Sequence, residues 1–405
     1  MPSILTRPSG GGGAGGGSIS VAAYSDAGFT NPITSADWGD TVYVRAENAS
    51  GITPVEYLFV FVDNSDNAEI IYQGANANSS WVVNVYVGNG ELYVFATEDA
   101  AEPKSWVGKS IEFEVVSNFW LDIYPNAILA VGTTKLRSLF TNDTINVRRS
   151  SDNSSDDFTP ITGVVPYIDG NSAGTSSTLS SFVGASNGLV TKLYDQSTYG
   201  NDVLNTTMAN QPILMSSGSF IPIRTEQNGI EFDGSNDFLA VALNTVPNFE
   251  WVGFGEFVTV NAVVNFIDVT SLRSLFTARS GGSIAPIILS VESGKVKVGI
   301  LGSSFESFTS TATISVGVTY TIGVTINGQT LKIYINGILD STHTITNTVA
   351  SRVIPPATNS LICISGNGIP IPSTHYLRAY LGTLVVEKGV YSDAEMLDVH
   401  NKFGS

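Results

Sequence analysis

The chain has 405 residues, of which 14% are charged and 40 are glycine, and its 36 acidic and 19 basic residues give a net charge of −17. An acidic surface repels phosphate backbones, so we expect no nucleic-acid partner. Hydrophobic residues make up 42%, and much of the polarity comes from Ser, Thr, Asn and Gly, which favour turns and strands. The composition therefore predicts an all-β protein with a substantial core, and excludes a helical bundle and most nucleotide-binding α/β enzymes.

Residues 1–18 form the first segment, a Gly-rich N-terminal arm that ends in SGGGGAGGGS. Such a composition has nothing to bury and predicts a flexible tether. Two interpretations stay open: a linker, or an arm that threads into an assembly partner with Ile4 and Leu5 as its anchor. We see no secretory signal here, and no uninterrupted apolar run of about 18 residues, so we expect no membrane insertion.

Residues 19–117 form the second segment, a series of short alternating runs separated by turn residues. The clearest runs are residues 41–45, 57–62, 81–87, 92–96 and 111–115, and residues 88–90 (Gly-Asn-Gly) are expected to form a turn. About seven strands at this spacing predict an immunoglobulin-like (Ig-like) β-sandwich. The segment has no His or Cys and no acidic motif, so we expect a spacer or docking module without chemistry.

Residues 118–405 form the third segment, which mixes helical and strand patterns. Residues 128–140 have helix-like apolar spacing, and residues 178–183 predict a short helical turn. Strands resume after residue 230, with Asn327-Gly328 and Asn336-Gly337 as hairpin dipeptides. Ser392 and Glu395 form a capping box that opens a closing helix. The single cysteine, Cys363, lies in an apolar run and is expected to be a buried strand residue.

Two stretches of this third segment resemble known families. An arginine pair followed by Ser-Ser-Asp, within residues 136–157, precedes residues 189–204 (LVTKLYDQSTYGNDVL), and Gln211-Pro212 and residues 230–237 follow in order. This arrangement resembles the amino-terminal half of the catalytic domain of the arabinofuranosidase B family. It is also similar to a module of bacteriophage structural proteins. The signature residues are Tyr194, Asp195, Gln196, Ser197, Gly200, Asn201 and Asp202.

The second stretch is residues 257–403, which resembles a laminin-G-like or concanavalin A-like (jelly-roll) sandwich. Its hairpin sequence LKIYING, the strand LGTLVV and the closing Ser-Asp-Ala-Glu helix carry the likeness. The two resemblances together imply one concanavalin A-like β-sandwich with a few short helices over residues 118–405.

The arabinofuranosidase resemblance raises the question of an active site. A retaining glycosidase uses two carboxyl groups roughly 5 Å apart. The candidate carboxylates of the later half are in no recognisable motif, most of them flank strands singly, and the family's vicinal cysteine pair is missing. These candidates are Glu250, Glu256, Asp268, Glu292, Glu306, Asp340 and Glu387. We therefore expect no catalytic residue and a non-enzymatic protein.

Asp195, Gln196, Asn201 and Asp202 are the densest polar cluster. Their oxygens could bind calcium, or they could bind backbone groups of a tight turn between two strands. We favour the turn, and we interpret Asp233-Gly234 to Asp237 in the same way. His343, His375 and His400 have no metal-site spacing, so no metal and no cofactor are expected.

Two further features bear on ligands. Arg148 and Arg149 could capture an anion, but pairing with Asp152, Asp156 or Asp157 is the simpler interpretation. Sugar binding needs exposed aromatic rings, and Tyr199, Trp251 and Phe254 lie in turn-rich stretches and are candidate glycan contacts. Aromatic residues such as these lie more often in the core than at a binding surface.

The sequence as a whole predicts a phage virion structural protein, such as a head fibre, tail fibre or capsid decoration protein. We expect it to be assembled in the host cytoplasm and exposed on the particle. Its partners would be other virion proteins, bound through the arm or the Ig-like segment, and host-surface glycans. A homo-oligomer is expected, a trimer for a fibre. The alternatives are a glycoside hydrolase related to α-L-arabinofuranosidases and a secreted bacterial surface adhesin.

Overall fold

The structure is a computed structural model, and it divides the chain into two compact units with the division after Asn118. Each unit is described by itself. The described residues are 18–25, 27–33, 35–37, 41–50, 54, 56–63, 68–75, 77–82, 88–97, 107–116, 119–137, 140, 142–159, 178–224, 227–242, 257–280, 284–348, 360–366 and 375–403.

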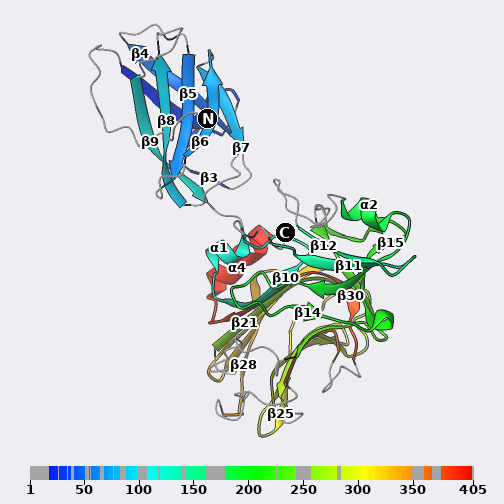
Figure 1. The fold of residues 1–405 in the computed structure, drawn as a ribbon. Coiled ribbons are helices and arrows are strands. Elements are labelled where there is room, and N and C mark those ends of the chain that lie inside the picture. The colour runs from blue at the N-terminus through cyan, green and yellow to red at the C-terminus, as the bar shows by residue number, and fades with distance from the viewer. Residues whose placement is uncertain are drawn as a thin grey trace. The chain divides into compact units, whose positions relative to one another are not determined.

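The first unit consists of two β-sheets (Figure 1). One sheet has the order β2-β1-β4-β7, formed by Pro32–Ile33, Ser18–Tyr24, Thr41–Ser50 and Asn78–Val82. The other has the order β3-β9-β8-β5-β6, formed by Ser35–Asp37, Val107–Val116, Gly88–Thr97, Glu56–Asp63 and Ala68–Gly74. Neighbouring strands are antiparallel except for the parallel pair β3–β9.

Alternation explains the strands of this unit. In β4 the side chains of Val42 and Val44 are fully buried, whereas Tyr43 lies between them on the opposite face of the strand. The expected turn at residues 88–90 is wrong, because these residues begin β8 and pair with β9, Gly88 opposite Val115. The long ladder outweighs the turn propensity of Gly and Asn. The Ig-like topology stays a prediction.

The second unit is built from one branched, nearly closed sheet whose two arms meet at β13 (Figure 1). One arm runs through β12 (Ser155–Phe158), β11 (Ile145–Arg149), β13 (Gly188–Leu193), β15 (Ile213–Ser216), β19 (Ile230–Asp233), β30 (Arg378–Lys388), β21 (Phe257–Phe266), β26 (Thr319–Asn327), β27 (Thr330–Ile335) and β28 (Ile338–Thr344). The other arm leaves β13 through β14 (Val203–Leu204), β20 (Leu239–Ala242), β29 (Ser360–Ile364), β22 (Arg273–Ser280), β23 (Ile284–Glu292), β24 (Lys295–Leu301) and β25 (Phe305–Thr309).

A single large core joins the two arms. It contains buried residues from both, such as Val147 and Phe232 on the first arm and Phe276 and Val298 on the second. Strand β30 pairs with β21 along one edge, and with β19 and then β10 (Ala127–Gly132) along the other. Short pieces complete the unit: α1 (Trp120–Ile123), α2 (Leu179–Val183), the 3₁₀ turn η1 (Met208–Asn210), β16 (Ser219–Phe220), β17 (Pro222–Arg224), β18 (Gln227–Asn228) and α4 (Asp393–Phe403).

The described part of residues 128–140, which leaves out 138 and 139, is not helical, and this corrects the expectation for the stretch. It begins with β10, which pairs with β30, Leu129 opposite Val386. All six residues of β10 are buried, because Ile128, Leu129 and Val131 join the main core while Ala130 joins a second cluster under α1 and α4. A strand buried on both faces reads as a continuous apolar run, which periodicity cannot distinguish from a helix.

Several local expectations are confirmed. Thr178 caps α2, where its side chain accepts a hydrogen bond from the amide of Ser181. Asn336 and Gly337, both with positive φ, form the two-residue turn between β27 and β28. The β26–β27 turn is shifted by one residue from the expected dipeptide and consists of Gly328 and Gln329.

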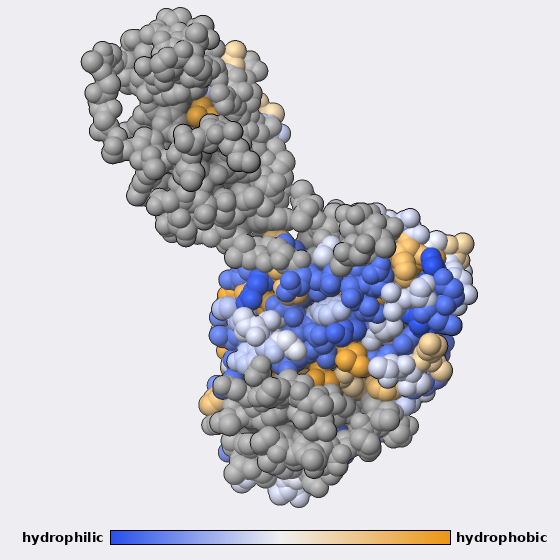
Figure 2. Space-filling view, viewed as in Figure 1, coloured by the Kyte–Doolittle hydropathy of each residue, from blue (hydrophilic) through white to orange (hydrophobic). Residues whose placement is uncertain are grey.

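Cys363 is fully buried in β29, as expected. Among the described residues, no helix combines the length and the hydrophobicity that crossing a bilayer would need. Figure 2 shows one face of the second unit, on which hydrophilic side chains predominate. The described sheet therefore presents a largely polar exterior on that side and keeps its apolar side chains in the core.

The helix α4 begins at a complete capping box. The amide of Ser392 donates to Glu395 Oε2 at 2.7 Å, and the amide of Glu395 donates to Ser392 Oγ at 3.3 Å. We predict that Ser392→Ala lowers the free energy of unfolding by about 1 kcal/mol, since one amide at the helix start loses its acceptor. Urea denaturation measures the change, and Ser181→Ala, an exposed serine within α2, serves as the control. Equal stability of the two variants would contradict the assignment.

Candidate functional site

The signature residues lie between β13 and β14, directly after the strand on which the two arms of the sheet meet. Asp195 is at the centre and is 5% exposed. Its Oδ1 accepts hydrogen bonds from the amides of Ala130 at 2.8 Å and Ser197 at 2.9 Å. Its Oδ2 accepts from Ser197 Oγ at 2.6 Å and from the amide of Asn201 at 2.8 Å. The carboxylate thereby fastens the signature turn to β10.

Gln196 and Asn201 are fully buried and attach the same turn to the segment around β10. Gln196 accepts from the amide of Leu136 at 2.7 Å and donates to the carbonyl of Thr134 at 2.9 Å. Asn201 Nδ2 donates to the carbonyl of Ile128 at 2.6 Å. Both side chains therefore satisfy backbone groups that would otherwise be buried without partners.

The remaining signature residues shape the ends of the turn. Gly200 has φ +69°, a conformation that favours glycine. Ser197 Oγ accepts from the amide of Tyr199 at 3.2 Å. Asp202 accepts from the amide of Asp195 at 3.0 Å and forms an ion pair with Lys192 at 3.0 Å. Tyr194 is the first residue of the turn, directly after β13.

Tyr194 donates its hydroxyl hydrogen to Asp157 Oδ1 at 2.7 Å, which connects the turn to β12. Burial, with the Asp157 hydrogen bond as a second cause, raises the pKa of Tyr194 above its ordinary value. Lys192 lies over the Tyr194 ring, 4.2 Å from its centroid. The lysine charge is thus shared between an aromatic face and Asp202.

These contacts favour the turn interpretation over calcium. Each oxygen of Asp195 already accepts two hydrogen bonds, and a cation would have to displace them. Burial raises the pKa of Asp195, and the bonds from Ser197, Asn201 and Ala130 act in the opposite direction. Within the described ranges, no group of three or more His, Cys, Asp or Glu side chains is arranged to hold a metal ion.

The second expected turn has the same construction. Asp233 Oδ1 accepts from the amides of Ser235 and Asn236 at 2.7 and 3.2 Å, and Gly234 has φ +81°. Asp237 accepts from the amide of Asp233 at 3.0 Å, and burial raises the pKa of Asp237 to about 6. The turn at residues 233–237 is confirmed.

The candidate glycan contacts are not assembled into one site. Tyr199 is partly buried and packs against the main core. Trp251 and Phe254 lie outside the described residues. Tyr199 is also not among the residues that line the pocket described below.

The described candidate carboxylates bind separate structural groups. Asp268 pairs with Arg273 and Glu292 with Lys297, while Asp340 accepts backbone amides at 2.6 and 2.7 Å. Glu306 likewise accepts from the amides of Thr346 and Asn347. Glu250 and Glu256 lie outside the described residues.

Glu387, on β30, is the exception, because it is 3% exposed and its Oε1 has no hydrogen-bond partner among the described residues. Burial raises the pKa of Glu387 to about 8. Hydrogen bonds from Tyr391 and Trp120 favour the charged form and act in the opposite direction, but burial has the larger effect. Burial thus favours the protonated form of this carboxyl group. Its hydrogen-bond partners Tyr391 and Trp120 belong to the cluster under α1 and α4.

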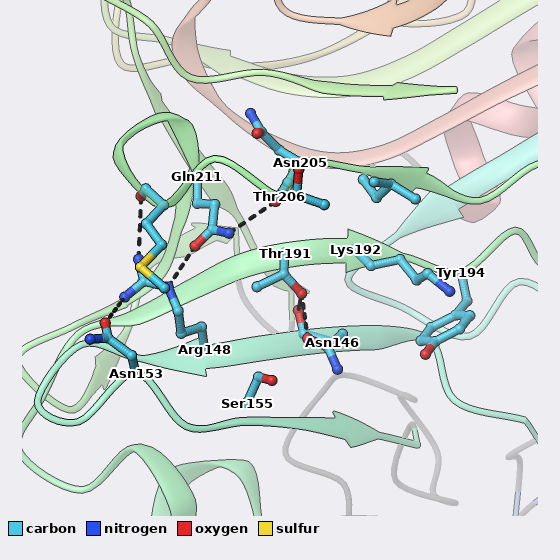
Figure 3. A pocket seen from close by; sticks show the side chains of 12 residues that line it. Asn146, Arg148, Asn153, Ser155, Thr191, Lys192, Tyr194, Asn205, Thr206 and Gln211 are labelled. Atoms are coloured by element: carbon cyan, nitrogen blue, oxygen red, sulfur yellow. Dashed lines mark hydrogen bonds between the residues drawn. The ribbon is translucent and has the colours of Figure 1, made fainter. Parts of the chain in front are cut away.

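A pocket of about 470 Å³ opens beside the signature, a volume typical of small-ligand sites. Its walls come from β11, β12, β13, β14 and the segment that follows β14 (Figure 3). The lining residues are mainly amide and hydroxyl side chains with two cations: Asn146, Arg148, Asn153, Ser155, Thr191, Lys192, Tyr194, Leu204, Asn205, Thr206, Met208 and Gln211.

Strand alternation places this lining on the outer side of the sheet. Val147 and Val190 point into the main core, so their neighbours Asn146, Arg148 and Thr191 point to the opposite side. A bulge between Asn146 and Val147 shifts the β11–β13 register. Thr191 Oγ1 and Asn146 Oδ1 are hydrogen-bonded to each other on the pocket floor (Figure 3).

Arg148 and Arg149 differ, although both were expected to pair with nearby aspartates. Arg149 does so, with Asp152 at 2.6 Å. Arg148 instead donates to Gln211 Oε1 at 2.7 Å, Asn153 Oδ1 at 2.7 Å and the carbonyl of Met208 at 3.3 Å, so the expectation for Arg148 is wrong (Figure 3). Consecutive strand residues point to opposite faces, which separates the two arginines.

The sequence analysis missed Arg148, Gln211 and Asn205 as parts of one site. Gln211 donates to the carbonyl of Asn205 at 2.9 Å, and Asn205 Nδ2 donates to the carbonyls of Asn210 and Phe238. The available signal was the order of an arginine pair, the signature and Gln211-Pro212. That order could have suggested a shared location but no contact.

Comparison with known proteins gives one family match and many similar structures. The sequence model described as the Concanavalin A-like lectin/glucanases superfamily matches residues 233–395. No curated protein sequence matches the chain. A GH54 α-L-arabinofuranosidase soaked with a cyclic sulfate inhibitor has 15% identity and a TM-score of 0.50, covering 69% of this chain and 62% of that one. This chain thus spans less than two thirds of that enzyme's length.

Two further solved structures show weaker likeness. The CBM40 of a Ruminococcus gnavus IT-sialidase, bound to α2,3-sialyllactose, has 16% identity and a TM-score of 0.36, covering 42% of this chain and 96% of that one. A SAP-like pentraxin from Limulus polyphemus has 14% identity and a TM-score of 0.33, covering 46% and 87%. The family match and the arabinofuranosidase likeness both concern the β-sheet of the second unit. The second unit has a concanavalin A-like, laminin-G-like sandwich fold.

We predict that Asp195→Asn lowers the free energy of unfolding by at least about 2 kcal/mol, because the amide nitrogen would face donors where an oxygen now accepts two hydrogen bonds. Asp152→Asn, at an exposed ion pair, should leave stability nearly unchanged. Urea unfolding followed by tryptophan fluorescence measures both. A second test of the turn interpretation uses the native protein. Its thermal unfolding midpoint should be the same in calcium and in EDTA, and an increase of that midpoint in calcium would contradict the turn interpretation.

We predict a pH effect from Glu387, whose pKa is about 8 in the folded protein and about 4.3 in an unfolded chain. Between these values the folded state holds a proton that the unfolded state has lost, so stability falls as pH rises through this window. Glu387→Gln should therefore be more stable than the native protein at pH 8 by more than about 1 kcal/mol, with a smaller difference at pH 5. Urea denaturation at both pH values tests this, with Glu292→Gln as control; equal differences at both pH values would refute it.

Proposed function

We propose that this chain is a non-enzymatic structural protein of a bacteriophage virion, a head fibre, tail fibre or capsid decoration protein, that binds host-surface glycans through its second unit. The observation that carries the glycan part is the polar pocket on a concanavalin A-like sandwich. Amide and hydroxyl side chains are the groups that hydrogen-bond sugar hydroxyls, and the family's description includes lectins. The virion part rests on the likeness of the Tyr194–Asp202 signature to a module of phage structural proteins.

The non-enzymatic part is supported by what the carboxylates do. A retaining glycosidase needs a nucleophile and an acid roughly 5 Å apart. Asp268, Glu292, Glu306 and Asp340 each bind their own cation or backbone amides, and Asp195 is saturated with hydrogen bonds. Such carboxylates act as structural acceptors.

The localisation and partners follow from the same role. The protein would be assembled in the host cytoplasm and exposed on the particle surface. Residues 1–18 or the first unit would dock to capsid or tail proteins, and a fibre would be a homotrimer. The second unit would then project its pocket toward the host.

A glycoside hydrolase is the second candidate, favoured by the fold likeness to a GH54 α-L-arabinofuranosidase. Incubation with aryl α-L-arabinofuranosides separates the two roles. Turnover that is lost on substitution of one carboxylate would favour the hydrolase. A secreted bacterial surface adhesin is the third candidate, and neighbouring genes for cell-wall proteins and an export system would favour it over capsid and portal neighbours.

We predict that deletion of residues 1–17 leaves the thermal unfolding of both units unchanged but removes the chain from phage particles, because the arm is the expected anchor. Purified particles, probed by immunogold electron microscopy with an antibody to the second unit, give the measurement. Full-length chain supplied in the same way is the control. Normal incorporation of the truncated chain would refute the anchoring role, and unlabelled particles in the control would refute the virion role.

A further inference from the structure

Arg148 is a buried cation whose acceptors are all neutral. It is 8% exposed, and its three hydrogen bonds go to the Gln211 and Asn153 side-chain oxygens and to the Met208 carbonyl. In the described part of the chain it forms no ion pair with a carboxylate. Burying a charge without an opposite charge costs free energy, and burial lowers the pKa of Arg148. Within the described residues, its charge is therefore stabilised by the dipoles of two amide side chains and a carbonyl group.

The guanidinium has hydrogens left to donate. Among the residues that the structure describes, Nη1 donates to Asn153 Oδ1 and Nη2 to the Met208 carbonyl, although each terminal nitrogen carries two hydrogens. Arg148 lines the pocket together with Thr191 and Asn146 (Figure 3), and its bond to the Met208 carbonyl reaches the first residue of η1. An anionic group entering the pocket would meet a charged donor that the described residues leave partly unused.

The other cation in the lining is already neutralised. Lys192 pairs with Asp202 at 3.0 Å and lies over the ring of Tyr194, whose hydroxyl is bound to Asp157. That end of the pocket is bordered by aspartates, whereas the Arg148 end presents amides and hydroxyls. Because aspartates would repel an anion at the Lys192 end, a negative group of a ligand is expected at the Arg148 end.

The rest of the lining suits a sugar ring. Leu204 and Met208 are 40% and 55% exposed, so they offer apolar surface at the pocket wall. Ser155 and Thr206, both exposed, add hydroxyl groups. This combination can contact both the apolar and the hydroxyl-bearing parts of a saccharide.

We propose that this pocket binds an acidic saccharide and that Arg148 receives its carboxylate. This inference rests on the proposed glycan-binding function and adds the charge class of the ligand. Arginine binds carboxylates through two parallel N–H donors, which gives both affinity and orientation. Of the two cations that line this pocket, Lys192 is paired with Asp202, so an acidic ligand would meet its free positive charge at Arg148.

The test is a glycan array that displays carboxylate-bearing and neutral glycans, probed with the full chain. We expect carboxylate-bearing glycans to be the ones bound, and the methyl ester of the best of them to bind at least tenfold more weakly by isothermal titration calorimetry. Leu204→Glu and Leu204→Gln form a matched pair at an exposed position. The glutamate variant should bind at least tenfold more weakly than the glutamine variant, because only it adds a negative charge to the pocket.

Arginine substitutions give a second measurement. Arg148→Gln should reduce binding at least tenfold, whereas Arg149→Gln, on the opposite face of β11, should not change it. Thermal unfolding checks that each variant is folded. Equal binding of Leu204→Glu and Leu204→Gln, or preferential binding of neutral glycans, would overturn the acidic-ligand inference while leaving glycan binding in place. Binding of no glycan at all would overturn both.

Discussion

The carboxylate of Asp195 is the contact on which the arrangement of the second unit depends. It accepts four hydrogen bonds, one from β10 and three from its own turn, at a position 5% exposed to solvent. The turn follows β13, where the two arms of the sheet separate, and β10 pairs with β30 in the first arm. The side chain of Asp195 thus connects the turn after β13 to β10, and through the β10–β30 pairing to the first arm of the sheet.

The pocket is formed at the same branch point, on the outer face of β13 and its neighbouring strands. Strand β13 sends its apolar side chains to the core and its polar ones outward, beside those of β11. The segment after β14 then returns over this outer face, held by the Asn205 and Gln211 hydrogen bonds, and forms the remaining wall. Scaffold and candidate binding site therefore share residues such as Gln211, which both supports the backbone and accepts from Arg148.

Local chemistry accounts for the elements that were predicted correctly. The capping box at Ser392 and the turn at Asn336-Gly337 depend on neighbours a few residues away, and the strand around Cys363 was predicted from its local apolar run, although its pairing partners β20 and β22 are distant in the chain. The predictions for residues 128–140 and 88–90 were wrong for the opposite reason, because pairing partners far along the chain determine the conformation of both stretches. Strand β10 is buried by β30, more than 250 residues later, and Gly88 is extended because β9 pairs with it.

The amino-acid pattern alone was sufficient for the all-β class and for the structural role of the signature turn, whereas the sandwich fold of residues 118–405 was implied by the resemblance to known families. The all-β class and the turn follow from alternation, turn residues and the density of short polar side chains, which act over short distances in the chain. The pocket and the difference between Arg148 and Arg149 required the folded contacts. Two adjacent arginines are chemically identical in sequence, and only the pleat of β11 and the return of Gln211 make one an exposed ion-pair partner and the other a buried donor.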